Sequence, residues 1–326
     1  LRMKKVPTEI LDCIKENQSF LILVHNKPDG DAIGSAIAFG KGLKALGKNV
    51  DYYIETPLED KLQFFSESRY FEDELRDEYD VVTFLDCSTI EYAFKPVPMV
   101  DARTTMVIDH HATNQGYGDI NFLEITAATA ELVFRILDAL GVELDPEMVE
   151  AVFTGISTDT GSFQFANVTA ETHQILSRLY EKRDNFAVLS KRLHSEKNYA
   201  QMKLYGKAVD SLQLYEDNTL AWIFLSYADI CKYGGPVQIT DDVANIGMNV
   251  IGVQLSATVK EVECGIYRVS LRSKTPFKID VSLIARKYGG GGHMRAAGFT
   301  FKGDLKALKK ELIEVIEYYR KHEEDI

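Results

Sequence analysis

Three short apolar runs within the first 110 residues restrict the fold more than any other feature of the sequence. They cover residues 20–24, 81–85 and 104–108, and each has the length of one buried strand. The segments between and after them include stretches with the apolar spacing of helices. Strands that alternate with helices form a mainly parallel sheet with right-handed connections and helices on both faces. An α/β domain is therefore predicted for this part of the chain.

A polar stretch at residues 25–34 joins the first apolar run to a helix predicted at 32–46. It contains His25, Asp29 and Asp31, and this strand-to-helix turn lies at the carboxyl edge of the sheet, where ligands bind. One imidazole and two carboxylates suit a metal ion. The alternative is a polar turn in which Asp31 caps the helix, and these residues alone do not decide between the two.

Ionisable side chains also follow the other two strands. Asp86 comes directly after the second run, and Asp109 and His110 after the third, while Asp159 is expected in a turn after a helix. The carboxyl ends of parallel strands meet at one edge, so these groups should lie near His25. Buried carboxylates without a cation would be costly, which favours a metal centre. The number of carboxylates suits two ions better than one.

The pattern changes in the second half of the chain. Residues 1–188 are predicted to form the first domain, 189–212 a charged helical connector, and 213–326 a smaller α/β domain. The smaller domain should contain a mixed sheet, because an alternating run follows a Cys-Gly turn and pairs with the strand before it. Its strands are expected at residues 219–225, 253–260 and 266–272.

Composition limits the setting in which the protein works. The formal net charge of −12 disfavours binding to long nucleic acid through a basic face. No apolar run approaches the roughly 18 residues of a membrane span, and no signal peptide is recognised, so no membrane association is expected. The cysteines are scattered without a Cys-x-x-Cys spacing, which is typical of reduced thiols in a cytoplasmic protein.

The order of these motifs resembles that of the DHH phosphoesterases, and the glycine-histidine run near the C-terminus resembles their DHHA1 domain. The resemblance covers nearly the whole chain. It is strongest to short cytosolic members that act as oligoribonucleases and as phosphatases of 3′-phosphoadenosine 5′-phosphate. The matching residues are His25-x-x-Pro28-Asp29-x-Asp31-Ala32, Asp86, Asp109-His110-His111, Asp159 and Gly289-Gly290-Gly291-Gly292-His293.

The resemblance implies two Mn²⁺ ions, with Mg²⁺ or Co²⁺ as substitutes, that together activate a hydroxide for attack on phosphorus. Mixed imidazole and carboxylate ligands suit Mn²⁺. In this interpretation Asp86 binds both ions. The implied ligands are His25, Asp29 and Asp86 for one ion, and Asp31, Asp86, His110 and Asp159 for the other.

Two further residues are implied in catalysis. Asp109 would accept a hydrogen bond from a neighbouring ligand imidazole and orient it. His111 would face the substrate, where it stabilises phosphoryl oxygens or protonates the leaving group. The alternative for His111 is a core histidine that donates to a backbone carbonyl.

The second domain is expected to hold the substrate. Glycines allow backbone N–H groups to approach an anion, and an arginine offers a fork for two phosphate oxygens. The alternatives are a flexible glycine loop and an arginine in a surface ion pair. The implied substrate-binding residues are Arg272, Ser273, Gly290, Gly291, Gly292 and His293.

The function implied is Mn²⁺-dependent hydrolysis of very short 5′-phosphorylated oligoribonucleotides, such as pApA and other nanoRNA, to mononucleotides, together with conversion of 3′-phosphoadenosine 5′-phosphate to AMP. A stand-alone cyclic di-AMP phosphodiesterase is one alternative, and a non-catalytic nucleotide-sensing module is another. Two related families fit less well. Family II pyrophosphatases lack the glycine-histidine run that this sequence has, and RecJ-type exonucleases are longer than this chain. A homodimer is expected, although no residue supports it.

Overall fold

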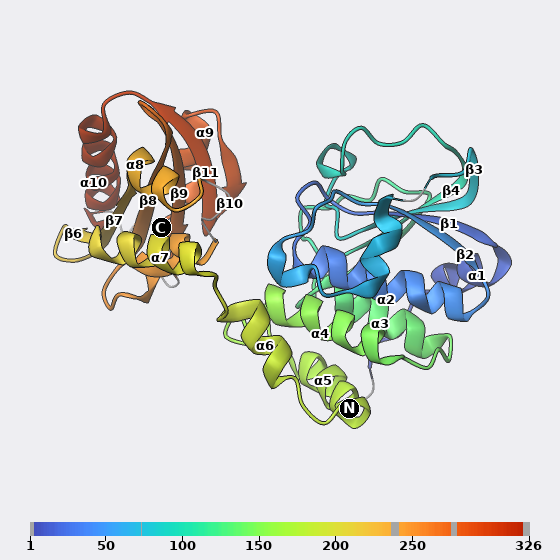
Figure 1. Ribbon diagram of the computed structural model, residues 1–326. Coiled ribbons are helices and arrows are strands. Elements are labelled where there is room, and N and C mark those ends of the chain that lie inside the picture. The colour runs from blue at the N-terminus through green and yellow to red at the C-terminus, as the bar shows by residue number, and fades with distance from the viewer. Residues whose placement is uncertain (1–2, 73, 236–240, 275–278, 322–326) are drawn as a thin grey trace. The chain divides into compact units, whose positions relative to one another are not determined.

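The computed structural model describes residues 3–321, apart from 73, 236–240 and 275–278. The chain divides into two compact units, Leu1–Glu196 and Lys197–Ile326 (Figure 1). The division falls inside the segment 189–212 that the sequence assigns to a connector. Helix α6 (Ala187–His194) packs against α4 (Pro146–Asp159) of the first unit, whereas α7 (Tyr199–Asp210) packs against β7 (Leu220–Leu225) of the second.

The first unit is built on a five-stranded sheet in the order β2-β1-β3-β4-β5. Every neighbouring pair is parallel, as predicted, so all five strands end at the same edge. The sequence also predicts a strand at residues 49–54, which is β2, whereas β5 was not predicted. The strands are β1 (Ser19–Leu23), β2 (Asn49–Tyr53), β3 (Glu78–Leu85), β4 (Asp101–Asp109) and β5 (Ile120–Leu123).

Helices cover one face of this sheet (Figure 1). Alternate residues of β1, such as Phe20 and Ile22, are buried in the large core that these helices form with the sheet. Two short 3₁₀ helices, η1 (Asp60–Leu62) and η2 (Ser66–Glu72), contribute to the same core. The α-helices of this unit are α1 (Thr8–Glu16), α2 (Gly30–Ala45), α3 (Thr129–Ala139), α4 (Pro146–Asp159), α5 (Ala170–Lys182) and α6 (Ala187–His194).

The opposite face differs from the expectation of helices on both faces. Leu21 and Leu23 point into a smaller core, which contains no residue of a described α-helix. The connection from β3 to β4 runs over this face and includes only the 3₁₀ helix η3 (Ile90–Tyr92). This connection runs in the opposite direction along the sheet from the β1-to-β2 connection, so a right-handed path takes it to the other face. The α/β class with a parallel sheet is confirmed.

The second unit contains a six-stranded mixed sheet in the order β10-β11-β9-β8-β7-β6. Only β7 and β8 pair in parallel, so the predicted mixed sheet is confirmed. The strands are β6 (Gln213–Tyr215), β7 (Leu220–Leu225), β8 (Leu255–Glu263), β9 (Ile266–Ser273), β10 (Gly291–His293) and β11 (Ala296–Lys302).

Helices lie on both faces of the second sheet. Leu220 and Trp222 pack with α9 and α10, while Ile223 and Leu225 pack with α7, α8 and η5. None of the helices described in either unit is long and apolar enough to cross a membrane. The helices of this unit are α7 (Tyr199–Asp210), α8 (Tyr227–Lys232), η5 (Asp241–Asn249), α9 (Val281–Lys287) and α10 (Leu305–Lys321).

Close packing between α2 and α4 brings the first turn of α2 against the end of α4. A Cβ atom on Gly34 would collide with the carbonyl oxygen of Ala151 and lie 3.0 Å from the backbone nitrogen of Gly155. Because backbone atoms cannot move aside as a flexible side chain can, glycine is required at this contact.

We expect Gly34→Ala to lower the free energy of unfolding by about 1–3 kcal/mol, since the added methyl group overpacks this contact. The matched control is Gly206→Ala in α7, where a Cβ meets nothing within 4 Å. Alanine is favoured over glycine inside a helix, so this replacement should raise the free energy of unfolding by about 0.5–1 kcal/mol. Urea denaturation followed by circular dichroism measures both, and equal effects would contradict the close α2–α4 contact.

Candidate metal centre

The predicted ligands meet at the carboxyl edge of the parallel sheet. Strand order reverses here: the chain passes from β1 to β2 in one direction and from β3 to β4 in the other, which marks the usual ligand-binding point of such sheets. His25 lies just beyond β1, Asp86 directly follows β3, and Asp109 ends β4. The structure therefore brings these residues together by strand order.

The turn before α2 holds two carboxylates in different ways. Asp29 is the N-cap of α2, and its Oδ1 accepts hydrogen bonds from the backbone N–H groups of Asp31 (3.0 Å) and Ala32 (3.1 Å). Asp31 is completely buried and accepts the N–H groups of Thr129 (2.6 Å) and Ala130 (2.9 Å) at the start of α3. Asp29, and not Asp31, caps α2.

Asp86 is the central carboxylate of the cluster. It is 2% exposed and its φ is +52°, in the left-handed region that Asp tolerates better than most residues. The hydroxyl of Thr129 donates to its Oδ1 over 2.9 Å. Its two oxygens face different histidines: Oδ2 lies 3.7 Å from Nε2 of His25, and Oδ1 lies 3.6 Å from Nε2 of His110.

Around Asp86 the ligand atoms form two groups. His25, Asp29 and Asp86 have ligand atoms within 4.8 Å of one another, and the same holds for Asp31, His110 and Asp159. The first group is the set that the family resemblance implied for one ion. The second contains three of the four residues implied for the other ion, and Asp86, the fourth, lies 3.6 Å from His110. A third combination joins His111 to Asp86 and His110.

The donor set fits divalent cations. Nε2 of His110 is buried and has no hydrogen-bond partner, although it lies 3.2 Å from Oδ2 of Asp159. Its Nδ1 lies 3.1 Å from the carbonyl oxygen of Thr126, and Nδ1 of His25 lies 2.9 Å from that of Asn26. These carbonyl contacts assign the proton to Nδ1 and direct the Nε2 lone pair at the carboxylates, the arrangement usual for histidine ligands.

Asp109 orients a different histidine from the one expected. Its Oδ1 accepts a hydrogen bond from Nδ1 of His111 over 2.8 Å, whereas the ligand candidate His110 is held by the Thr126 carbonyl. The other oxygen of Asp109 accepts the side-chain amide of Asn114 over 2.7 Å. Asn114 was not identified from the sequence. The only signal there is its closeness to the Asp-His-His motif, three residues after His111.

Burial and mutual repulsion shape the charges of the carboxylates. Burial raises the pKa of Asp31 well above its usual value, and the charges of Asp86 and Asp159 raise it further. Burial together with Asp29 and Asp159 raises the pKa of Asp86 to about 7. The ionised form of these carboxylates is therefore unfavourable, and a bound cation would stabilise it strongly.

The imidazoles respond in the opposite sense. Burial alone would lower the pKa of His25, but the contact with Asp29 and the charge of Asp86 outweigh it and raise the pKa to about 9. The pKa of His110 rises to about 11 against its burial, because Asp159 and the other carboxylates surround it. Without metal ions, protonated imidazoles thus supply the positive charge that offsets the carboxylates.

Asp159 is the last residue of α4. It therefore lies in the helix itself, and not in the turn after the helix, where it was expected. One helical turn before it, a Cβ atom on Gly155 would lie 2.6 Å from Oδ1 of Asp31 and 2.5 Å from the Cβ of Ala130. The absence of a side chain at Gly155 therefore leaves room for the buried carboxylate.

The expected substrate residues of the second unit lie on β9 and β10, apart from Gly290, which directly precedes β10. Strand register places Ala296 opposite both Arg272 and His293. Nε of Arg272 donates to Oδ1 of Asn245 over 3.3 Å. His293 ends β10, and its side chain lies outside the part that the structure describes.

Ser273 and the glycines have mainly structural surroundings. Ser273 is buried, and its hydroxyl donates to the carbonyl oxygen of Ile279 over 2.8 Å, so this hydroxyl already has a structural partner. A Cβ on Gly290 or Gly292 would collide with β11, whereas nothing lies within 4 Å at Gly291.

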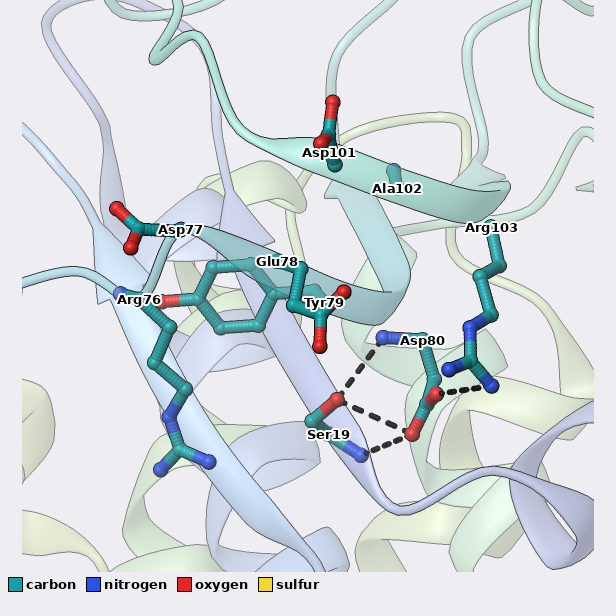
Figure 2. A pocket seen from close by; sticks show the side chains of 9 residues that line it. All are labelled: Ser19, Arg76, Asp77, Glu78, Tyr79, Asp80, Asp101, Ala102 and Arg103. Atoms are coloured by element: carbon teal, nitrogen blue, oxygen red, sulfur yellow. Dashed lines mark hydrogen bonds and ion pairs between the residues drawn. The ribbon is translucent and has the colours of Figure 1, made fainter.

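A pocket of about 410 Å³ lies at the other edge of the first sheet, where β1, β3 and β4 begin (Figure 2). Arg103 pairs there with Asp80 over 3.2 Å, and Asp80 also accepts the backbone N–H and the hydroxyl of Ser19. Asp80, Ser19 and Arg103 are thus engaged with one another, and the pocket lies at the opposite ends of the strands from the metal centre.

Comparison with known proteins gives a consistent result. The N-terminal domain of the DHH family matches residues 19–156, and the DHHA1 domain matches residues 223–319. The bifunctional oligoribonuclease and PAP phosphatase NrnA of Thermus thermophilus is 32% identical over 297 residues, 90% of this chain and 88% of the relative. Its namesake in Bacillus subtilis is 27% identical over 321 residues, 93% of this chain and 99% of that one.

Two solved structures share the fold. An exopolyphosphatase-related protein from Bacteroides fragilis has a TM-score of 0.88 at 25% identity and covers 98% of this chain and 99% of its own. RecJ from Thermus thermophilus in complex with Mn²⁺ has a TM-score of 0.55 at 14% identity. It covers 98% of this chain and 56% of its own, and this likeness concerns the fold alone.

We expect the protein stripped of metal by a chelator to lose stability as pH rises from about 4 to 9. The folded pKa of Asp86, about 7, exceeds its unfolded value of 3.8, so between these values the folded state binds more protons and stability falls with pH. His25 acts in the same direction between 6.5 and about 9. Urea denaturation across this pH range measures the effect.

Asp86→Asn removes one of these groups and should flatten the loss between pH 4 and 7. The matched control is Asp119→Asn, because hydrogen bonds from Thr105 lower the pKa of Asp119 and its contribution is complete above its unfolded value of 3.8. An unchanged slope in Asp86→Asn would contradict the charge balance described for the cluster.

Proposed function

This chain belongs to the DHH family and is therefore a phosphoesterase, and we propose that it hydrolyses very short 5′-phosphorylated oligoribonucleotides to mononucleotides with the help of divalent cations. A second proposed substrate is 3′-phosphoadenosine 5′-phosphate. The printed names of the Thermus and Bacillus relatives, both oligoribonucleases and PAP phosphatases, support these two substrate classes.

The observation that carries the proposal is the division of the ligand atoms around Asp86 into two groups. We propose two Mn²⁺ ions, one held by His25, Asp29 and Asp86, the other by Asp31, His110 and Asp159 with Asp86 shared. When bound, such cations stabilise charge on phosphoryl oxygens and make water a better nucleophile. The donor set of imidazoles and carboxylates favours Mn²⁺, with Mg²⁺ or Co²⁺ as substitutes.

His111 is the proposed proton donor to the leaving group. Its Nδ1 donates to Asp109, so the proton to be transferred belongs on Nε2. Burial alone would lower the pKa of His111, but the hydrogen bond to Asp109 and the charge of Asp86 raise it. The Asp109 carboxylate thus favours the protonated imidazole that such a role requires.

The second unit is proposed to hold the substrate phosphate. Arg272 lies on β9 with its guanidinium positioned by Asn245 and by the carbonyl oxygen of Leu271 (3.0 Å). The space beside Gly291, where no atom would contact a Cβ, would let an anion approach the backbone closely. The four cysteines are free, which supports a reducing, cytoplasmic setting.

Four substrates distinguish the proposal from its rivals. The protein is incubated with Mn²⁺ and pApA, 3′-phosphoadenosine 5′-phosphate, cyclic di-AMP or a five-nucleotide RNA, and AMP release is followed. We expect release from pApA, the RNA and 3′-phosphoadenosine 5′-phosphate. Release from cyclic di-AMP without release from pApA would indicate a cyclic dinucleotide phosphodiesterase, and binding without release would indicate a sensor.

Asp86→Asn should lower AMP release by more than about 100-fold, because both ligand groups lose a shared carboxylate. Asparagine tolerates positive φ as aspartate does, so the variant tests charge and not backbone strain. Asp119→Asn, at an exposed carboxylate on the same unit, is the control and should retain full activity. Wild-type turnover by Asp86→Asn would overturn the proposed ligand sets.

Arg272→Lys should raise the KM for pApA by about tenfold or more with little change in kcat, because the fork that binds two phosphate oxygens is lost while the charge is kept. Arg268→Lys, at an exposed position on the same strand, is the matched control. Equal KM values for the two variants would remove Arg272 from the proposed substrate site.

A further inference from the structure

We propose that the ring of Phe165 is the stacking surface for a nucleobase of the substrate beside the cleaved phosphate. The inference rests on the proposed function, since it requires a nucleotide substrate. Neither the sequence motifs nor the metal cluster assigns a role to this residue.

Phe165 lies in a turn that is fixed to the metal centre at both ends. The turn directly follows Asp159, and the backbone N–H of Phe165 donates to the carbonyl oxygen of Thr160 over 3.0 Å. The side-chain amide of Asn167 donates to the carbonyl oxygens of Asp159 (3.1 Å) and Ala127 (3.0 Å). The turn is thereby connected to the end of α4 and to the segment directly before α3, the helix whose first two residues hold Asp31.

The backbone of this turn is strained. Gly161, Ser162 and Phe163 have φ values of +55°, +57° and +65° in succession. A positive φ is unusual for a bulky residue such as Phe163, and such conformations persist only where the surrounding structure enforces them. They concentrate at ligand-binding sites, where they direct a side chain that an ordinary turn would place elsewhere.

The two phenylalanines of the turn have opposite environments. Phe163 packs inward, with its ring centroid 6.0 Å from that of Phe153 in an edge-to-face arrangement. Phe165 is 57% exposed, and its ring lies directly over Gly161. A Cβ on Gly161 would collide with three atoms of the Phe165 ring, so glycine is needed there for the ring to occupy its place.

Exposure alone would not support the proposal, since single exposed apolar residues are ordinary; Leu46, at the far end of α2, is 38% exposed. Phe165 differs because its ring is held on a glycine close to Asp159. The carboxylates of the centre bind cations and offer no apolar surface to a base, and its imidazoles are engaged with those carboxylates. Every base has a π-face, so an aromatic ring binds short oligonucleotides with little regard to sequence.

The test compares pApA with two analogues that each lack one of its adenines. Stacking on one ring contributes about 5- to 150-fold to binding. We expect Phe165→Ala to raise the KM for pApA, and for the analogue that keeps the stacked base, by a factor in this range with kcat changed far less. The other analogue should show the same KM with both proteins.

Two further variants separate stacking from simple packing. Phe165→Trp should restore the wild-type KM, whereas Phe165→Leu should not, because leucine is apolar without a π-face. Leu46→Ala is the control for truncation of an exposed apolar side chain and should leave every KM unchanged. Because Phe165 is exposed, all its variants should retain the wild-type circular dichroism spectrum.

Three results would overturn the inference. The first is an equal loss with pApA and both analogues, which would indicate a structural role of the turn. The second is full rescue by Phe165→Leu, and the third is an unchanged KM in Phe165→Ala while the wild type cleaves pApA. If the wild type itself releases no AMP from pApA, the proposed function fails first, and the stacking inference fails with it.

Discussion

The buried carboxylate of Asp31 is the constraint on which the first unit depends. It is completely shielded from water, yet it accepts two backbone N–H groups from the start of α3, where the helix dipole also favours an anion. Those two hydrogen bonds fix α3 against the first turn of α2. The close contact at Gly155 then fixes α4, because any side chain there would occupy the space of Asp31. One carboxylate thus links three helices to the sheet edge.

In the described part of the first unit, the non-glycine residues with positive φ lie in segments next to the carboxylate cluster. Lys27, Asp86 and Phe163 all have positive φ values, and they lie respectively in the turn after β1, at the end of β3 and after α4. Each of these segments contains or directly adjoins a proposed ligand. The metal-free cluster adds electrostatic cost, since burial and like charges raise the pKa of Asp31 and Asp86. Strain and charge repulsion thus lower the stability of the metal-free protein at this edge of the sheet. A cation bound there would raise the stability again.

The sequence was sufficient for the features that follow from strand order. Because parallel strands end at one edge, the residues after three apolar runs were predicted to meet, and they do. Features that depend on side-chain packing were not accessible. The partner of Asp109 could have been either neighbouring histidine, and only the Thr126 carbonyl decides it. Ser273 matched a binding motif yet is buried, and the position of Phe165 requires a strained turn that no local pattern signals.

In the glycine run of the second unit, the individual glycines have different surroundings, which the sequence motif does not reveal. Gly290 and Gly292 are required by packing, because a Cβ on either would collide with β11, whereas the space around Gly291 is open. Four glycines therefore do not form a uniform phosphate cradle. Close approach of β10 to β11 keeps Ala296 between Arg272 and His293 in register. The packing glycines thus set the geometry of the proposed phosphate grip, while Gly289 and Gly291 are the members of the run with open space around them.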